Sequence, residues 1–217
     1  CMGKFAPQRT GPVLLIMGLG MQLTAWPPQM VQGLTAAGLR VIRLDNRDIG
    51  LSQYFDQLGV PNMLWATLKY KLGLPIHAPY SVHDMALDAL GVLDALGIAR
   101  AHVIGASMGG MIAQRLALAA PQRVLSLHSI MSSSGARGLP SARPEVLRAL
   151  FSRPSGSGLD PVIGHYVKLF GVIGSPGFPV DQTLLRERIA DGVRRSYHPQ
   201  GTLRQMLAVA ADSQRAN

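Results

Sequence analysis

The sequence contains one cysteine, Cys1, among its 217 residues, so no disulfide can form within the chain and no cysteine cluster can hold zinc. This usage fits a reducing compartment, and we expect a cytoplasmic location. The sequence also has no apolar run of the roughly 18–20 residues that a membrane helix needs, and it opens with no signal-peptide pattern. We therefore expect no membrane insertion.

Charged residues are scarce, at 15% of the chain, and acidic residues are fewer than basic ones, 12 against 21. Most of the bases are arginines that stand singly, with Arg194 and Arg195 as the exception. Because a nucleic-acid surface needs clustered bases, the net charge of +9 predicts no nucleic-acid partner. Hydrophobic residues make up 47% of the chain, enough for a sizeable core, which excludes a disordered protein.

Apolar runs bounded by glycine and polar residues alternate with segments of helical periodicity up to residue 135. This alternation is typical of an α/β protein with a doubly wound, mostly parallel sheet. Residues 53–79 contain several glycines and prolines and predict an irregular stretch. The predicted strands are 12–17, 39–44, 101–104 and 123–131, and the predicted helices between them are 28–37, 81–97 and 107–120.

The pattern changes at Gly135, after which we find no convincing strand. We therefore divide the chain into a core, residues 1–135, and a helical cap, residues 136–217. Helices are predicted in the cap at 145–152, 161–172, 182–196 and 202–212. Six apolar cap residues fit either the lining of a substrate pocket or ordinary packing against the core: Leu147, Leu150, Phe151, Leu169, Phe170 and Phe178.

Residues 105–109 read Gly-Ala-Ser-Met-Gly and match G-x-S-x-G, the pattern of a nucleophile elbow. Such a turn joins a strand to a helix and points the serine hydroxyl out of the sheet edge, while small neighbours let other chain segments pass closely. The N–H groups and dipole at the start of the helix then face the substrate oxygen on which negative charge develops. An apolar strand before Gly105 and an apolar helix after Gly110 favour this interpretation of Ser107.

The sequence resembles the α/β-hydrolase fold family over about residues 12–135. Residues 14–20, Leu-Leu-Ile-Met-Gly-Leu-Gly, are similar to the family's strand and oxyanion loop, and residues 44–52, Leu-Asp-Asn-Arg-Asp-Ile-Gly-Leu-Ser, to the stretch after its next strand. Residues 81–97 and 103–110 resemble the helix before the nucleophile strand and the elbow itself. The residues of the first two stretches are most similar to those of bacterial esterases of the aclacinomycin-methylesterase-like group.

The resemblance implies a serine hydrolase that cleaves carboxylic esters through an acyl-enzyme on Ser107, with a small apolar ester as substrate. It implies an oxyanion hole formed by the backbone N–H groups of Leu19 and Met108. Neither a cofactor nor a metal is expected. Three charged residues after the second strand are interpreted as structural: Asp45, Arg47 and Asp48.

A catalytic serine also needs a histidine base and an orienting carboxylate, which in this family follow it in the chain. His128 lies within a predicted strand, and we find no later strand to carry the acid and base. One interpretation is an improvised triad of His198 with Asp181 or Asp191. The other, which we favour, is that the chain is truncated at both ends, before the strands that carry both groups. The start at Cys1 rather than Met agrees with it.

Other functions stay open at this point. The same residues fit other chemistry of the family, such as lactone opening, perhydrolysis, carbon–carbon cleavage or peptidase action, and also a non-catalytic ligand-binding fragment. Dinucleotide binding is disfavoured, because residues 18–23 begin as G-x-G but lack the third small residue. His77 and His83 have no partners in the sequence that predict a metal site.

Overall fold

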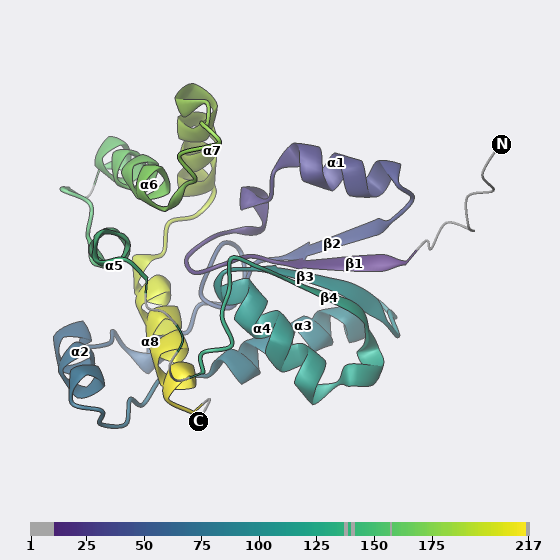
Figure 1. Ribbon diagram of the computed structural model, residues 1–217, viewed down its shortest axis with the longest axis horizontal. Helices are drawn as coiled ribbons and strands as arrows, with labels where there is room; N and C mark the ends of the chain where they lie inside the picture. Colours follow the sequence, from purple (N-terminus) through teal and green to yellow (C-terminus); the bar gives the residue numbers. More distant parts are fainter. Residues whose placement is uncertain (1–10, 137–138, 140–141, 157, 216–217) are drawn as a thin grey trace. The chain divides into compact units, whose positions relative to one another are not determined.

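A computed structural model describes residues 11–136, 139, 142–156 and 158–215, so Cys1 lies outside the described residues. The chain forms two compact units, whose elements are labelled in Figure 1. The first unit comprises Cys1–Arg137 together with His198–Asn217, and the second comprises Gly138–Tyr197. The C-terminal helix therefore belongs with the sheet.

The first unit is built on a four-stranded sheet in which every pair of neighbouring strands is parallel. Its strands are β1 (Pro12–Ile16), β2 (Arg40–Leu44), β3 (Ala101–Ala106) and β4 (Val124–Ile130), in the spatial order β2-β1-β3-β4. These strands confirm the four that the apolar runs predict. Because they run the same way, their carboxyl ends meet at one edge of the sheet, where sites of open α/β proteins lie.

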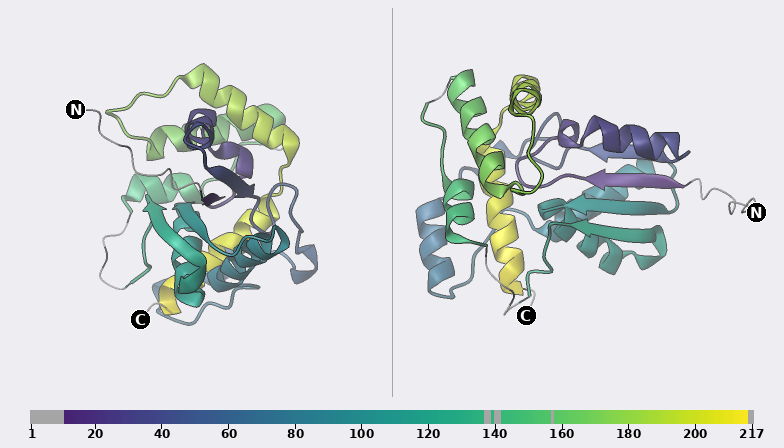
Figure 2. Two further views of the ribbon diagram at one scale, coloured as in Figure 1. Left: turned by 90° about the vertical axis from the view of Figure 1, so that its right-hand side faces the viewer. Right: turned by 45° about the horizontal axis from the view of Figure 1, so that its top comes forward.

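Helices cover both faces of the sheet. α1 (Pro28–Ala36) lies on one face, and α3 (Val82–Ala95) and α4 (Met108–Ala119) lie on the other, as Figures 1 and 2 show. Successive β1 side chains point to opposite faces, so that Leu14 packs with α3 and α4 and Leu15 packs with α1. This arrangement confirms the doubly wound fold. Three short 3-10 helices join these elements: η1 (Leu23–Ala25), η2 (Asp56–Leu58) and η3 (Pro121–Arg123).

Two helices of the first unit differ from the sequence-based expectation. α2 (Met63–Lys71) forms within residues 53–79, so the prediction of an irregular stretch is wrong there. Asn62 caps this helix by accepting a hydrogen bond from the backbone N–H of Trp65. α8 (Pro199–Arg215) packs against α2 and against the core of the sheet unit, although the sequence places it in the cap.

The second unit contains only helices among its described residues. They are α5 (Pro144–Phe151), α6 (Leu159–Ile173) and α7 (Gln182–Arg195). α6 and α7 pack against each other around Ile163, Ile189 and Ala190. The unit is shorter at its carboxyl end than the expected cap of residues 136–217, because α8 packs with the sheet unit.

Candidate active site

Ser107 stands alone between the end of β3 and the start of α4, which is where the G-x-S-x-G pattern predicts it. Its backbone has φ 54° and ψ −122°, a conformation that residues with a Cβ rarely adopt. The Ser107 N–H donates to the carbonyl of Ile130 at the end of β4, over 2.9 Å, and this bond holds the turn. The Ser107 side chain is exposed and makes no capping hydrogen bond to α4. The hydroxyl is therefore free to meet a ligand.

The glycines around Ser107 are required by close backbone approaches. A Cβ on Gly105 would collide with the Gly109 carbonyl oxygen, and a Cβ on Gly109 would collide with the Ile16 carbonyl oxygen. A Cβ on Gly18 would lie 3.1 Å from the Ser107 Cβ and 3.5 Å from its Oγ. The loop after β1 therefore passes directly beside the serine, and a side chain at Gly18 would be in tight contact with it.

Polar groups from other parts of the chain hold this loop in place. Asn46 Nδ2 donates to the Met17 carbonyl over 2.8 Å, and Gln205 Oε1 accepts from the Gly20 N–H over 3.0 Å. Leu19 lies between these two points. No hydrogen bond to the Leu19 or Met108 N–H is found within the described part of the chain. Two backbone donors are thus left near Ser107, one of them at the N-terminus of α4, where the helix dipole favours negative charge.

The loop after β2 is held by its own charged residues. The Asp45 carboxylate accepts from the N–H groups of Leu23 and Leu51, over 2.7 and 3.0 Å. Arg47 forms a two-point ion pair with Asp88 on α3, at 2.6 and 2.8 Å. Burial disfavours the charged guanidinium, but the hydrogen bonds and charge of Asp88 outweigh this and raise the Arg47 pKa. These contacts agree with the structural interpretation of both residues.

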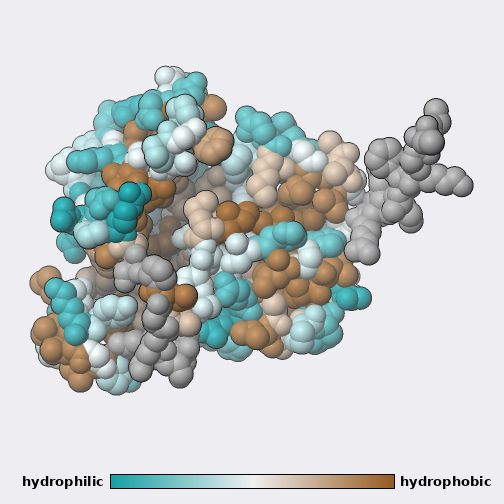
Figure 3. Space-filling model, viewed as in Figure 1, coloured by the Kyte–Doolittle hydropathy of each residue, from teal (hydrophilic) through white to brown (hydrophobic). Residues whose placement is uncertain are grey.

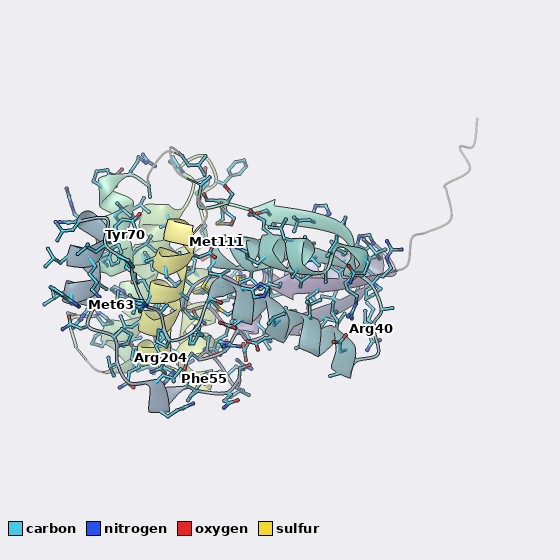
Figure 4. The ribbon with its side chains drawn as sticks, turned by 90° about the horizontal axis from the view of Figure 1, so that it is seen from below. Arg40, Phe55, Met63, Tyr70, Met111 and Arg204 are labelled. Atoms are coloured by element: carbon cyan, nitrogen blue, oxygen red, sulfur yellow. The ribbon has the colours of Figure 1, made fainter. Side chains whose placement is uncertain are left out.

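Asp48 lies in the same loop and forms a buried ion pair with Arg204 of α8, with both side chains 0% exposed. Burial opposes ionisation of Asp48, but hydrogen bonds from Arg204, the Phe55 N–H and the Tyr80 hydroxyl outweigh it and hold the Asp48 pKa below its usual value. Arg204 also donates to Asp56 over 2.9 Å. Figure 4 shows Arg204, in the N-terminal half of α8, close to Phe55. The sequence does not single out Arg204, since nothing in its local pattern separates it from the other arginines.

His198 belongs to the same cluster, so the improvised triad is wrong. Its Nε2 pairs with Asp56 Oδ1 over 2.9 Å, its Nδ1 pairs with the Asp48 carbonyl over 3.0 Å, and its ring stacks on Tyr54 at 3.9 Å. The two carboxylates proposed for the triad have other partners. Asp181 caps α7 by accepting from the N–H groups of Thr183 and Leu184, and Asp191 pairs with Arg194.

The other histidines that follow Ser107 are also engaged elsewhere. His128 Nε2 lies 3.1 Å from Ser126 Oγ, which in turn lies 2.7 Å from His102 Nδ1. His165 meets the edge of the Tyr166 ring in the second unit, and burial together with Lys168 lowers its pKa. Among the residues that the structure describes, no histidine or carboxylate is hydrogen-bonded to Ser107.

One cluster has the donor atoms for a metal ion. Ligand atoms of Asp48, Asp56 and His198 lie within 4.8 Å of one another. The Arg204 guanidinium already binds both carboxylates of this group, at 2.7 and 2.9 Å. The positive charge of Arg204 compensates the two carboxylates, as a bound cation would. We therefore interpret the cluster as structural.

Comparison with known proteins identifies the family. The chain matches the alpha/beta hydrolase fold family over residues 11–156. It belongs to that family. Relatives of this α/β-hydrolase include the rhodomycin D methylesterases DauP of Streptomyces sp. (strain C5) and DnrP of Streptomyces peucetius, 35% and 34% identical over 178 residues. Each match covers 82% of this chain and 52% of the relative, so the chain spans about half the length of these relatives.

Solved structures show the same fold at lower identity. A meta-cleavage product hydrolase (CumD) of Pseudomonas fluorescens IP01 superposes with a TM-score of 0.63 at 21% identity, covering 93% of this chain and 65% of that one. The enol-lactonase of Burkholderia xenovorans LB400 gives a TM-score of 0.56 at 22% identity, with the same two coverages of 93% and 65%. These similarities support the fold and carry no statement about the substrate.

Proposed function

We propose that this chain carries the nucleophile and the oxyanion hole of a carboxylic ester hydrolase. The observation that carries the proposal is the position of Ser107, exposed on a strained turn at the N-terminus of α4 and directly beside the Gly18 loop. A serine in this setting meets a substrate carbonyl from one side while backbone donors face the carbonyl oxygen. Family membership and the methylesterase relatives support hydrolysis.

In the proposed reaction, Ser107 Oγ attacks the carbonyl carbon of the ester and the carbonyl electron pair moves onto its oxygen. The N–H groups of Leu19 and Met108 donate hydrogen bonds to this oxyanion. When it collapses, the bond to the alcohol oxygen breaks, the alcohol leaves with a proton, and an acyl-enzyme remains on Ser107. Water then attacks the acyl group and releases the acid. A general base must take the Ser107 proton, and we assign no residue to it.

The names of two relatives and the apolar residues of the second unit support a proposal for the substrate class. Because two relatives are named as methylesterases of rhodomycin D, we propose a methyl ester of a small apolar molecule. We propose further that residues 138–197 act as a cap. Leu147, Phe151 and Phe178 of this unit are 40%, 58% and 81% exposed, and they supply apolar surface that a ligand can cover.

The proposal is tested by a matched pair of serine variants. The wild-type chain, Ser107→Ala and Ser134→Ala are incubated with a fluorophosphonate and with short aryl esters, and the labelled peptide is identified by mass spectrometry. Ser134 is the control because it is also an exposed serine at the carboxyl edge of the sheet. Because we assign no base, we expect labelling and ester cleavage by this chain to be slow, and both to depend on Ser107 and not on Ser134. Equal labelling and cleavage in Ser107→Ala would exclude Ser107 as the nucleophile.

A further inference from the structure

The stretch around α2 has an unusual concentration of exposed apolar side chains. The most exposed of them, Leu64, is 87% exposed, and Figure 3 shows hydrophobic side chains gathered over α2 at the lower left. Isolated exposed leucines are ordinary, whereas a contiguous apolar patch marks a surface that binds something. The exposed large apolar residues of this stretch are Leu58, Val60, Leu64, Trp65, Leu68, Tyr70, Leu72 and Leu74.

The opposite face of α2 already holds the helix against the first unit. Met63 and Ala66 pack with a small core that contains Leu207 and Ala211 of α8, and Figure 4 shows Met63 on the side of α2 near α8. α2 is therefore apolar on two faces, of which one is packed. Packing within the first unit does not account for the second apolar face of α2.

The outward apolar residues form one stripe. At about 3.6 residues per turn, Leu64, Trp65, Leu68 and Leu72 fall within an arc of about 100° around the helix axis. Such a stripe is as wide as the buried face of an ordinary amphipathic helix. Asn62 caps the first turn of the helix that carries the stripe.

Two lysines stand at the edges of this stripe. At the same helical pitch, Lys71 falls just outside one edge and Lys69 just outside the other, and the Lys69 ammonium lies 5.7 Å from the centre of the Trp65 ring. No acidic residue occurs in the sequence between Asp56 and Asp84. This stretch of sequence therefore combines apolar surface, an amphipathic indole and positive charge, and it contains no carboxylate of its own.

We propose that α2 docks this protein onto the surface of an anionic phospholipid bilayer. Leucine and tryptophan side chains enter the boundary between head groups and acyl chains, while flanking lysines extend to lipid phosphates. A second copy of the chain fits the patch less well, because a symmetric contact through α2 would bring the lysines of both copies together. Such docking differs from spanning, and none of the helices searched in the described part of the chain is long and apolar enough to cross a membrane.

Vesicle sedimentation tests the proposal directly. The 217-residue chain is mixed with vesicles of phosphatidylcholine alone or with about one third phosphatidylglycerol, and the bound fraction is measured. We expect binding to the anionic vesicles that weakens with salt. The double variant Leu64→Ser/Leu68→Ser should lower the partition coefficient by about tenfold or more, and Lys69→Glu/Lys71→Glu should abolish the preference for anionic lipid.

Matched controls separate the patch from general effects. Leu118→Ser removes an apolar side chain that is 74% exposed on α4, and Arg100→Glu reverses a charge on an exposed residue outside α2. Both should bind like the wild type. Trp65 is 55% exposed and Trp26 is 3% exposed, so a blue shift of tryptophan fluorescence on vesicles reports Trp65. Ser107→Ala should bind unchanged, which makes the result independent of the proposed hydrolase chemistry.

Three outcomes would overturn the proposal. The first is no binding to anionic vesicles, and the second is equal binding of the Leu64→Ser/Leu68→Ser variant and the wild type. The third is that the wild type does not bind vesicles but forms a concentration-dependent dimer, which the Leu64→Ser/Leu68→Ser variant does not form. That result would assign the stripe to contact with a second copy.

Discussion

Asp48 and Arg204 are 156 residues apart in the chain, yet they form a two-point hydrogen-bonded ion pair at 2.7 and 2.8 Å with no exposure of either side chain. Asp48 lies in the loop after β2 and Arg204 lies on α8. The next residue on α8, Gln205, accepts from Gly20 in the loop beside Ser107. The buried pair therefore connects the C-terminal helix to the loops that shape the candidate active site.

Loss of the Arg204 charge should destabilise the fold strongly. Arg204→Met leaves the Asp48 carboxylate buried without its counter-ion, which costs about 3–5 kcal/mol in comparable buried pairs. Urea unfolding followed by circular dichroism measures the change. The control is Arg40→Met, because Arg40 is exposed at the start of β2, as Figure 4 shows, and should change the free energy of unfolding by less than about 0.5 kcal/mol. A similar small change in Arg204→Met would contradict the importance of the pair.

The same pair predicts how stability depends on pH. The Asp48 pKa is lowered in the folded state, so its contribution is complete above the unfolded value of about 4 and is lost as the pH falls through the folded value. Hydrogen bonds from Arg204 and His198 lower the Asp56 pKa in the same direction. The free energy of unfolding should therefore fall steeply below about pH 4. In Asp48→Asn this fall should be smaller, whereas Asp160→Asn, which removes an exposed carboxylate, should retain it.

Much of the fold was predictable because its signals are local. The four strands are short apolar runs between glycines and polar residues, and α3 begins at a capping box, in which the Asp84 N–H donates to Ser81 Oγ and the Ser81 N–H donates to the Asp84 carboxylate. The elbow was predictable for the same reason. Gly105 and Gly109 have to be glycine, and they mark the turn in the sequence.

The sequence-based predictions fail where a sequence signal has two meanings or where a residue's partner is distant in the chain. Pro61 and Gly73 predict an irregular stretch, but they flank α2 and bound the helix rather than exclude it. His198 is a chemically suitable base, yet its partners Asp56 and Tyr54 lie more than a hundred residues earlier in the chain and no local pattern reveals them. Long-range burial of polar groups is set by the tertiary fold and leaves no periodic trace in the sequence.

Two glycine-to-alanine substitutions should have opposite effects. In Gly109→Ala the new methyl group collides with the Ile16 carbonyl oxygen. Because the backbone cannot shift without cost, we expect the free energy of unfolding to fall by about 3 kcal/mol or more. In Gly91→Ala the methyl group meets nothing within 4 Å on α3, so helix propensity should stabilise the protein by about 0.5–1 kcal/mol. Thermal unfolding of both variants distinguishes them. Equal melting temperatures would mean that the Gly109 backbone is not held against β1.

The backbone conformation of Ser107 predicts a difference between two variants that both lack the nucleophile. Ser107→Ala keeps a Cβ at φ 54°, whereas Ser107→Gly removes it and relieves the strain. Neither variant loses a capping bond, because the Ser107 side chain makes none to α4. We therefore expect Ser107→Gly to be more stable than Ser107→Ala by about 1 kcal/mol, as measured by urea unfolding. If Ser107→Ala is the more stable of the two, residue 107 is not held in the left-handed region, and the strained elbow on which the assignment of Ser107 rests is absent in solution.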